Sequence, residues 1–233
     1  MGPGIWRFYL GHVFWIFFVK TCREALILTQ DGRLMALSDH NISTAFGDWE
    51  FLWAPYDAPT YQAVLEQLQS DDIVLEIGAG DLRLARKMAA VTCKVYGIEI
   101  NASVLYQGLK NGETLPPNLI ATQADARAEK FPSDVSVGVI LMRHCTHLMI
   151  YAEKLREIGC QKLITNARWH LGVETIDLQA PRIRYEQVKV GRFACWCGAV
   201  GFKIGSVDLL TSETEAIIHE VSNCPACSNV SKQ

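Results

Sequence analysis

The most informative stretch of this chain reads Val74-Leu75-Glu76-Ile77-Gly78-Ala79-Gly80-Asp81-Leu82. An apolar run typical of a buried strand ends in a Gly-x-Gly turn flanked by acids, and a helical pattern follows from Arg83 to Ala90. Because glycine has no Cβ, the backbone at Gly78 and Gly80 can turn tightly and approach a ligand closely. A strand, such a turn and a helix N-terminus together form a nucleotide-sized site at the carboxyl edge of a parallel sheet.

The chemistry of the turn argues against two common phosphate-binding motifs. A dinucleotide fingerprint requires a third glycine where this chain has Arg83, and Asp81 would repel a pyrophosphate. A P-loop requires Gly-Lys-Ser/Thr, which does not occur at this turn. An acidic turn instead suits a ligand that carries an amine and no phosphate.

The pattern Glu76-x-Gly78-x-Gly80-Asp81 resembles motif I of the class I S-adenosylmethionine-dependent methyltransferases. In that family the turn cradles the methionine part of the cofactor, and an acid binds its ammonium group. The resemblance implies that Gly78 and Gly80 hold the methionine end of S-adenosylmethionine and that Asp81 binds its amine.

Two further acids follow at the spacing of the same family. Lys94–Glu99 reads as a strand ending in an acid about 20 residues after the glycine turn, where a carboxylate can hold both ribose hydroxyls. Leu119–Ala126 resembles the third cofactor motif, whose acid, here Asp125, accepts a hydrogen bond from the adenine amino group. The alternative is a set of strand-end acids that only cap helices or face solvent. The candidate cofactor-binding residues are Glu76, Gly78, Ala79, Gly80, Asp81, Glu99, Ile100, Asp125 and Ala126.

The alternation of apolar runs and helical patterns predicts an α/β fold. We expect a doubly wound, mostly parallel, Rossmann-like methyltransferase sheet with helices on both faces. Asn101 and Gly159 are the expected caps of two of its helices. Further strands are expected at 135–142 and 162–166, and helices at 57–69, 101–109 and 147–158.

Three regions are expected along the chain. Residues 1–55 form an N-terminal extension with a β-hairpin around Asp31-Gly32, 56–192 the methyltransferase core, and 193–233 the last strands and a small zinc-binding extension. The apolar segment 5–19 is short for a helix that spans a bilayer, and no signal-peptide cleavage site follows it. We therefore expect a cytoplasmic protein without stable membrane insertion.

The methyl acceptor should bind after the fourth strand of the core, where the transferable methyl group emerges in this family. The chain has Arg143-His144-Cys145-Thr146-His147 there, and not the Asn/Asp-Pro-Pro-aromatic motif usual in enzymes that methylate exocyclic amines of bases. His144 or His147 is a candidate general base, because imidazole titrates near neutral pH. Cys145 is a candidate covalent nucleophile. The alternative is structural: His147 caps or flanks the next helix, and Cys145 is a small buried apolar residue.

Four of the eight cysteines lie in two short turns, Cys195-Trp196-Cys197-Gly198 and Cys224-Pro225-Ala226-Cys227. Two such turns can place four thiolates around one tetrahedral zinc ion and leave no open coordination position. The first turn also resembles the opening zinc turn of glutathione-dependent formaldehyde-activating proteins, over 195–202 only. Disulfides or a redox pair are the alternatives. We expect structural zinc bound by Cys195, Cys197, Cys224 and Cys227.

The overall charge carries no strong nucleic-acid signature. The net charge is −3 and the pI is about 6.1, so no general basic surface is expected. Arg182–Val190 should form a strand that divides its charged side chains between two faces, which argues against a basic stripe for RNA.

These observations favour an S-adenosylmethionine-dependent methyltransferase that works by in-line displacement at the sulfonium methyl group. The acceptor stays open among a small molecule, a protein and RNA. The alternative function is a catalytically inactive module of the same fold that interacts with RNA or protein.

Overall fold

The computed structural model describes the backbone of residues 25–28 and 34–37 and all of 58–110, 114–143, 145–168 and 172–227, with two compact units, Met1–Pro55 and Tyr56–Gln233. In the first unit, β1 (Ala25–Leu28) pairs antiparallel with β2 (Leu34–Leu37). The predicted hairpin is therefore confirmed, while its Asp-Gly turn lies outside the described residues. No helix in the described ranges is long and apolar enough to cross a membrane.

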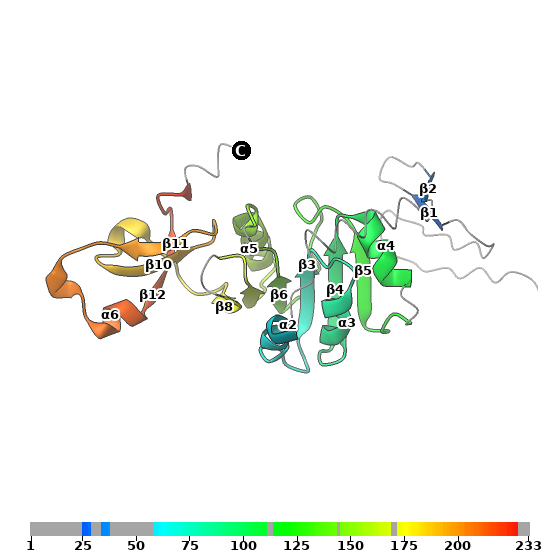
Figure 1. Ribbon diagram of the computed structural model, residues 1–233, viewed down its shortest axis with the longest axis horizontal. Helices are drawn as coiled ribbons and strands as arrows, with labels where there is room; N and C mark the ends of the chain where they lie inside the picture. The colour runs from blue at the N-terminus through cyan, green and yellow to red at the C-terminus, as the bar shows by residue number, and fades with distance from the viewer. Residues whose placement is uncertain are drawn as a thin grey trace, which may run out of the picture. The chain divides into compact units, whose positions relative to one another are not determined.

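The second unit is built on a six-stranded sheet with the order β5-β4-β3-β6-β7-β8 (Figure 1). The strands are β3 (Ile73–Ile77), β4 (Lys94–Glu99), β5 (Leu119–Gln123), β6 (Val137–Ile140), β7 (Lys162–Thr165) and β8 (Glu174–Asp177). The first five are parallel, and β8 runs antiparallel to β7. The strand order reverses between β3 and β6, which is where doubly wound folds bind their ligands.

Helices cover both faces of this sheet, as predicted. They are α2 (Ala58–Leu65), α3 (Arg83–Ala89), α4 (Ala102–Lys110) and α5 (Leu148–Glu157). Successive side chains of β3 enter different cores: Val74 packs in a cluster with residues of α2 and α3, and Leu75 packs in another with residues of α5. This alternation confirms the doubly wound α/β fold.

A second, four-stranded sheet has the order β11-β10-β12-β9. It comprises β9 (Ile183–Arg184), β10 (Gly191–Cys195), β11 (Val200–Lys203) and β12 (Ile218–Ser222), with the short helix α6 (Ser212–Ala216) before β12. The prediction of one strand from Arg182 to Val190 is wrong. The side chain of Gln187 accepts a hydrogen bond from the Arg184 backbone N–H (2.8 Å) and starts a 3-10 turn after only two strand residues.

Helix α4 passes so close to the glycine turn that position 108 accommodates only glycine. A Cβ at Gly108 would lie 2.2 Å from the backbone oxygen of Asp81. We expect Gly108→Ala to lower the free energy of unfolding by about 2 kcal/mol or more, because backbone must shift to make room. Urea denaturation measures this.

Gly138→Ala is the matched control on β6. Its Cβ would meet side-chain atoms of Leu155 (nearest 2.4 Å), which can move by rotation about side-chain bonds. Equal losses of stability in the two variants would contradict the close backbone contact between α4 and the turn.

Candidate functional site

The glycine turn after β3 is held against the end of β4. The backbone N–H groups of Gly78 and Ala79 both donate to the carbonyl oxygen of Ile98, at 2.8 and 3.0 Å. Gly78 and Gly80 have positive φ angles of 78° and 55°, a conformation that glycine adopts without a steric penalty. The predicted roles of these glycines in turning the chain are therefore physically explained.

Glu99 ties the turn to the neighbouring strand end. One carboxylate oxygen accepts the Gly80 N–H at 2.8 Å, and the other accepts the Asn101 N–H at 2.7 Å. The residue is only 7% exposed. A carboxylate has about four acceptor positions, so each oxygen keeps one for a ligand hydroxyl. Asn101 in turn caps α4, because its side-chain oxygen accepts the N–H groups of Ser103 and Val104.

Asp81 faces an arginine of its own turn. Its side chain is 4% exposed, and both carboxylate oxygens accept hydrogen bonds from Nε of Arg83, at 2.9 and 2.7 Å. A ligand amine would therefore have to share this carboxylate with a guanidinium group. The predicted contact between Asp81 and an ammonium group stays a prediction.

Glu76 lies beneath the turn and is 5% exposed. Burial raises the pKa of Glu76 well above its usual range, and the nearby Glu99 and Asp81 carboxylates raise it further. Its Oε2 atom has no hydrogen-bond partner within the part of the chain that the structure describes. A buried oxygen without a partner costs about 1–3 kcal/mol, so this atom is a natural contact for a bound ligand.

An open pocket lies at the carboxyl edge, between the glycine turn, β5 and α5. Side-chain hydrogen bonds from Arg127 lower the pKa of Asp125 to about 2, so its carboxylate is an acceptor at every physiological pH. Of the predicted cofactor residues, Gly78, Ile100, Asp125 and Ala126 line this pocket. It is completed by Ile77, Ile98, Ala124, Arg127, Met142, His147 and Tyr151.

The residues predicted to act on the methyl acceptor lie in different places. His147 lines the pocket at the start of α5, with Nδ1 3.2 Å from the Thr146 hydroxyl oxygen. Cys145 packs against the core, and burial raises the pKa of its thiol, which disfavours the nucleophilic thiolate. His144 lies outside the described residues. Sequence reasoning missed Tyr151, whose pKa burial raises to about 12, so that its hydroxyl stays protonated.

Arg83 and Arg127 were also missed, although the sequence contains a signal for both. Each follows a strand-end aspartate at the same spacing, in Asp81-Leu82-Arg83 and Asp125-Ala126-Arg127. In both places the guanidinium group bonds back to the carboxylate. A repeated Asp-x-Arg pattern at two strand ends therefore marks paired charges at the edge of this site.

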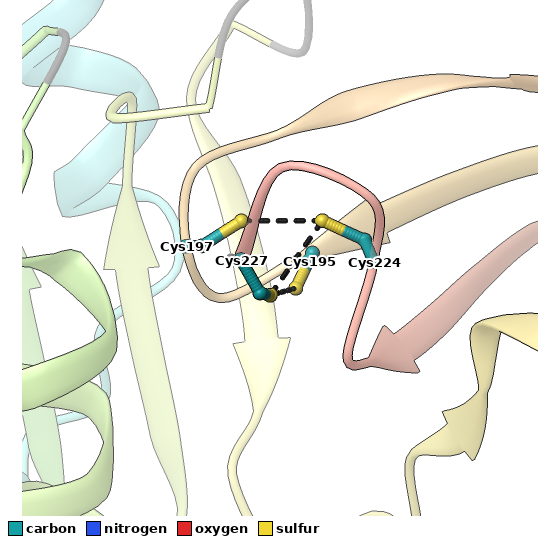
Figure 2. Close-up of side chains that lie close together, drawn as sticks. All are labelled: Cys195, Cys197, Cys224 and Cys227. Atoms are coloured by element: carbon teal, nitrogen blue, oxygen red, sulfur yellow. Dashed lines mark hydrogen bonds between the residues drawn. The ribbon is translucent and has the colours of Figure 1, made fainter. Parts of the chain in front are cut away.

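The four predicted cysteine ligands lie together, as Figure 2 shows. Their sulfur atoms all lie within 4.8 Å of one another, and three pairs are 3.4–3.6 Å apart. Four sulfurs around a tetrahedral zinc ion would be about 3.8 Å apart, since each Zn–S bond is about 2.3 Å, whereas a disulfide requires about 2.05 Å. None of the four forms a disulfide with another described residue, and their spacing fits a metal ion.

The cysteine cluster is anchored to the core of the larger sheet by Trp196. Trp196 lies between Cys195 and Cys197 in the sequence, is 1% exposed and belongs to the same core cluster as Leu155 and Leu163. The guanidinium of Arg182 lies 3.7 Å from the centre of the Trp196 ring. The cysteine turns are thus packed against the core of the larger sheet through Trp196.

Arg168 forms a second link between the two sheets. It is buried and pairs with Glu174 of β8 and Glu220 of β12, so its guanidinium group is not presented to an anionic ligand.

No protein-family description matches this chain, and no curated protein matches it. Among solved structures, a dimethyladenosine transferase from Plasmodium falciparum aligns with a TM-score of 0.40 and 22% identity, over 47% of this chain and 41% of that one. A phosphoethanolamine N-methyltransferase from Haemonchus contortus aligns with a TM-score of 0.44 and 16% identity, over 55% and 33%.

A further match is a putative S-adenosylmethionine-dependent methyltransferase from Listeria monocytogenes, with a TM-score of 0.39 and 18% identity, over 46% and 52% of the two chains. The chain spans between 46% and 63% of the first three solved structures that it matches. At these TM-scores the likeness carries no argument about activity. The Rossmann-like fold itself rests on the strand order described above.

The buried Glu76 should make stability depend on pH. A raised pKa keeps Glu76 protonated to a higher pH in the folded chain than in the unfolded chain, where a glutamate ionises at about pH 4.3. Stability is therefore highest below this pH and is lost as the pH rises towards the folded pKa, by up to about 1.4 kcal/mol per pH unit. We expect Glu76→Gln to remove this loss, measured by urea denaturation between pH 4.5 and 7.

The exposed Glu66 provides the control, since Glu66→Gln should leave the pH dependence of wild-type stability unchanged. A Glu76→Gln variant that loses as much stability as the wild type over this range would show that Glu76 is ionised in the folded chain.

Proposed function

We propose that this chain is an S-adenosylmethionine-dependent methyltransferase. The observation that carries the proposal is the position of Glu99, a buried carboxylate fixed by the N–H groups of Gly80 and Asn101 at the carboxyl edge of a doubly wound sheet. Each oxygen keeps an acceptor position, which suits a vicinal diol such as that of a ribose.

The residues of the edge also fit the other parts of this cofactor. A Cβ at Gly78 would lie 3.0 Å from the sulfur of Met142, so glycine keeps the turn clear. The ionised carboxylate of Asp125 can accept a hydrogen bond from an amino group on a base, and it cannot donate one to a carbonyl oxygen in the same place. The partnerless Oε2 of Glu76 is an additional contact on the glycine side. Asp81 after β3, Glu99 at the end of β4 and Asp125 after β5 thus suit an amine, a diol and an aromatic amine.

When bound, the cofactor supplies a methyl group activated by a positive sulfonium centre. The chain's own contribution is to bind and orient the two reactants. His147 is the candidate base: in the tautomer whose Nδ1–H donates to the Thr146 hydroxyl oxygen, Nε2 has the lone pair that takes a proton from the acceptor. The neutral Tyr151 hydroxyl can donate a hydrogen bond in the same pocket. The acceptor class, whether small molecule, protein or RNA, is left to a substrate screen.

A non-catalytic binding module of the same fold is the second candidate. Two of the three strand-end acids, Asp81 and Asp125, already have an arginine partner, so their charges are compensated without a ligand. Such a module would contact RNA or protein through the rest of its surface. Cofactor binding separates the two functions.

Calorimetric titration with S-adenosylhomocysteine tests the proposal. We expect saturable binding by the wild type and at least tenfold weaker binding by Glu99→Gln, because a hydrogen bond to a charged group contributes about 1.5–3 kcal/mol. Asp81→Ala should weaken binding similarly if its carboxylate holds the amine.

Asp134→Ala is the control for that titration. Asp134 pairs with Lys94 and Tyr96 near the start of β4, at the opposite end of the strand from Glu99. Its removal should change the Kd by less than about twofold. Absence of binding to zinc-loaded wild type would favour the binding module.

We also propose that the four cysteines hold a structural zinc ion. Hydrogen bonding from Cys197 lowers the pKa of Cys195 to about 4, whereas the hydrogen bond to Cys195 raises the pKa of Cys197 and burial raises that of Cys227. A bound cation would displace the protons of these two thiols. Four sulfur ligands fill a tetrahedral site, so no position is left for water or substrate. The role assigned to zinc is therefore to hold together the turns after β10 and β12.

Metal analysis of the purified protein should give one zinc ion per chain. We expect Cys224→Ser to lose the metal and to unfold at a lower temperature than the wild type, because metal binding contributes to folding. Cys93→Ser changes an exposed cysteine outside the cluster and should keep both properties. Wild-type protein without zinc, with all four thiols open to titration, would rule out the site.

A further inference from the structure

The side-chain ammonium group of Lys154, on α5, donates three hydrogen bonds to the backbone of one loop. Its Nζ atom donates to the backbone oxygens of Ala126 at 2.6 Å, Arg127 at 3.0 Å and Glu129 at 2.6 Å. An ammonium group has three N–H donors, so these bonds use all of them. The same Nζ lies 4.2 Å from the centre of the Phe131 ring, farther along the loop.

The loop that Lys154 holds is the one that follows β5 and carries Asp125. Within it, the backbone oxygen of Asp125 accepts the N–H groups of Ala128 and Glu129, at 3.0 and 2.9 Å, so the chain makes a tight turn. The turn brings three carbonyl oxygens together around one point. Without a cation there, these oxygens would repel one another and lose their hydrogen bonds.

The residues held by Lys154 are also residues of the pocket. Asp125, Ala126 and Arg127 all line it, and so does Tyr151, which lies about one helical turn before Lys154 on α5. Residues three apart lie on the same side of a helix. One face of α5 therefore supplies both a pocket wall and the clamp for the opposite loop.

We propose that Lys154 is a positioning residue for the adenine end of the cofactor, because it fixes the loop that aims the Asp125 carboxylate into the pocket. This inference rests on the function proposed above. Lys154 touches no ligand itself and acts through the backbone of Ala126 and its neighbours. Lysine suits the task better than arginine, since a compact ammonium can serve three converging oxygens while a planar guanidinium cannot.

The test compares two ligands that differ at the amino edge of the base: S-adenosylhomocysteine and S-inosylhomocysteine, in which an oxygen replaces the amino group and the neighbouring N1 carries a hydrogen. The wild type should bind the adenosyl compound at least tenfold more tightly, because the oxygen would face the acceptor-only Asp125. Lys154→Met keeps the apolar stem and removes the donors. We expect it to bind S-adenosylhomocysteine about tenfold more weakly and to prefer it less than about threefold.

Lys162→Met is the matched control. Lys162 is also partly buried and also donates to a backbone oxygen, that of Gln67 at 2.8 Å, but it lies at the start of β7, away from the carboxyl edge. The Lys162→Met variant should keep the tenfold preference for S-adenosylhomocysteine, even if its stability changes. Lys154→Arg, which keeps the charge and the fold, should fall between the wild type and Lys154→Met in ligand preference.

The outcomes separate the two proposals. A wild type that binds neither compound overturns the methyltransferase proposal and this inference with it. A wild type that prefers the adenosyl compound, together with Lys154 variants that keep the full preference, overturns the inference alone. If Lys154→Met weakens the binding of both ligands equally, Lys154 has a structural role only, and the inference is likewise overturned. Should Lys154→Met fail to fold, the ligand preference of Lys154→Arg decides.

Discussion

The carboxylate of Glu99 is the constraint on which the rest of the site depends. By accepting the N–H groups of Gly80 and Asn101, it joins the glycine turn after β3 to the beginning of α4. A buried carboxylate is stable only when such donors compensate for lost hydration. The same two bonds fix the spacing of neighbouring strand ends, and the close passage of Gly108 over Asp81 follows from this arrangement.

Helix α5 connects this edge to the rest of the molecule. On one side it presents Tyr151 to the pocket and Lys154 to the loop after β5. Its Leu155 belongs to the core cluster that also buries Trp196, the residue between Cys195 and Cys197 in the sequence. The cysteine turns and the pocket wall therefore pack against the same core, although the sulfurs themselves take no part in the proposed chemistry.

Local patterns in the sequence predicted β3 to β7, the caps of α4 and α5 and the cysteine cluster, because each depends on residues close together in the chain. The strand predicted at 182–190 was wrong, and β8 was not predicted. Asn101 and Gly159 hold the predicted places at the ends of α4 and α5, Gly159 with a φ of 83°. Leu82 was not foreseen: it has a φ of 65° at the start of α3, where the pattern gives no glycine. The contribution of Lys154 could not be predicted either, since it depends on how α5 packs against a distant loop.

A crystal structure of the zinc-loaded protein with S-adenosylhomocysteine would show whether Glu99 binds the ribose. We expect ribose hydroxyls within hydrogen-bonding distance of both oxygens of Glu99, with the adenine amino group at Asp125 and the amino-acid end at the glycine turn. Ligand density elsewhere, or an empty carboxyl edge at saturating ligand, would contradict this expectation.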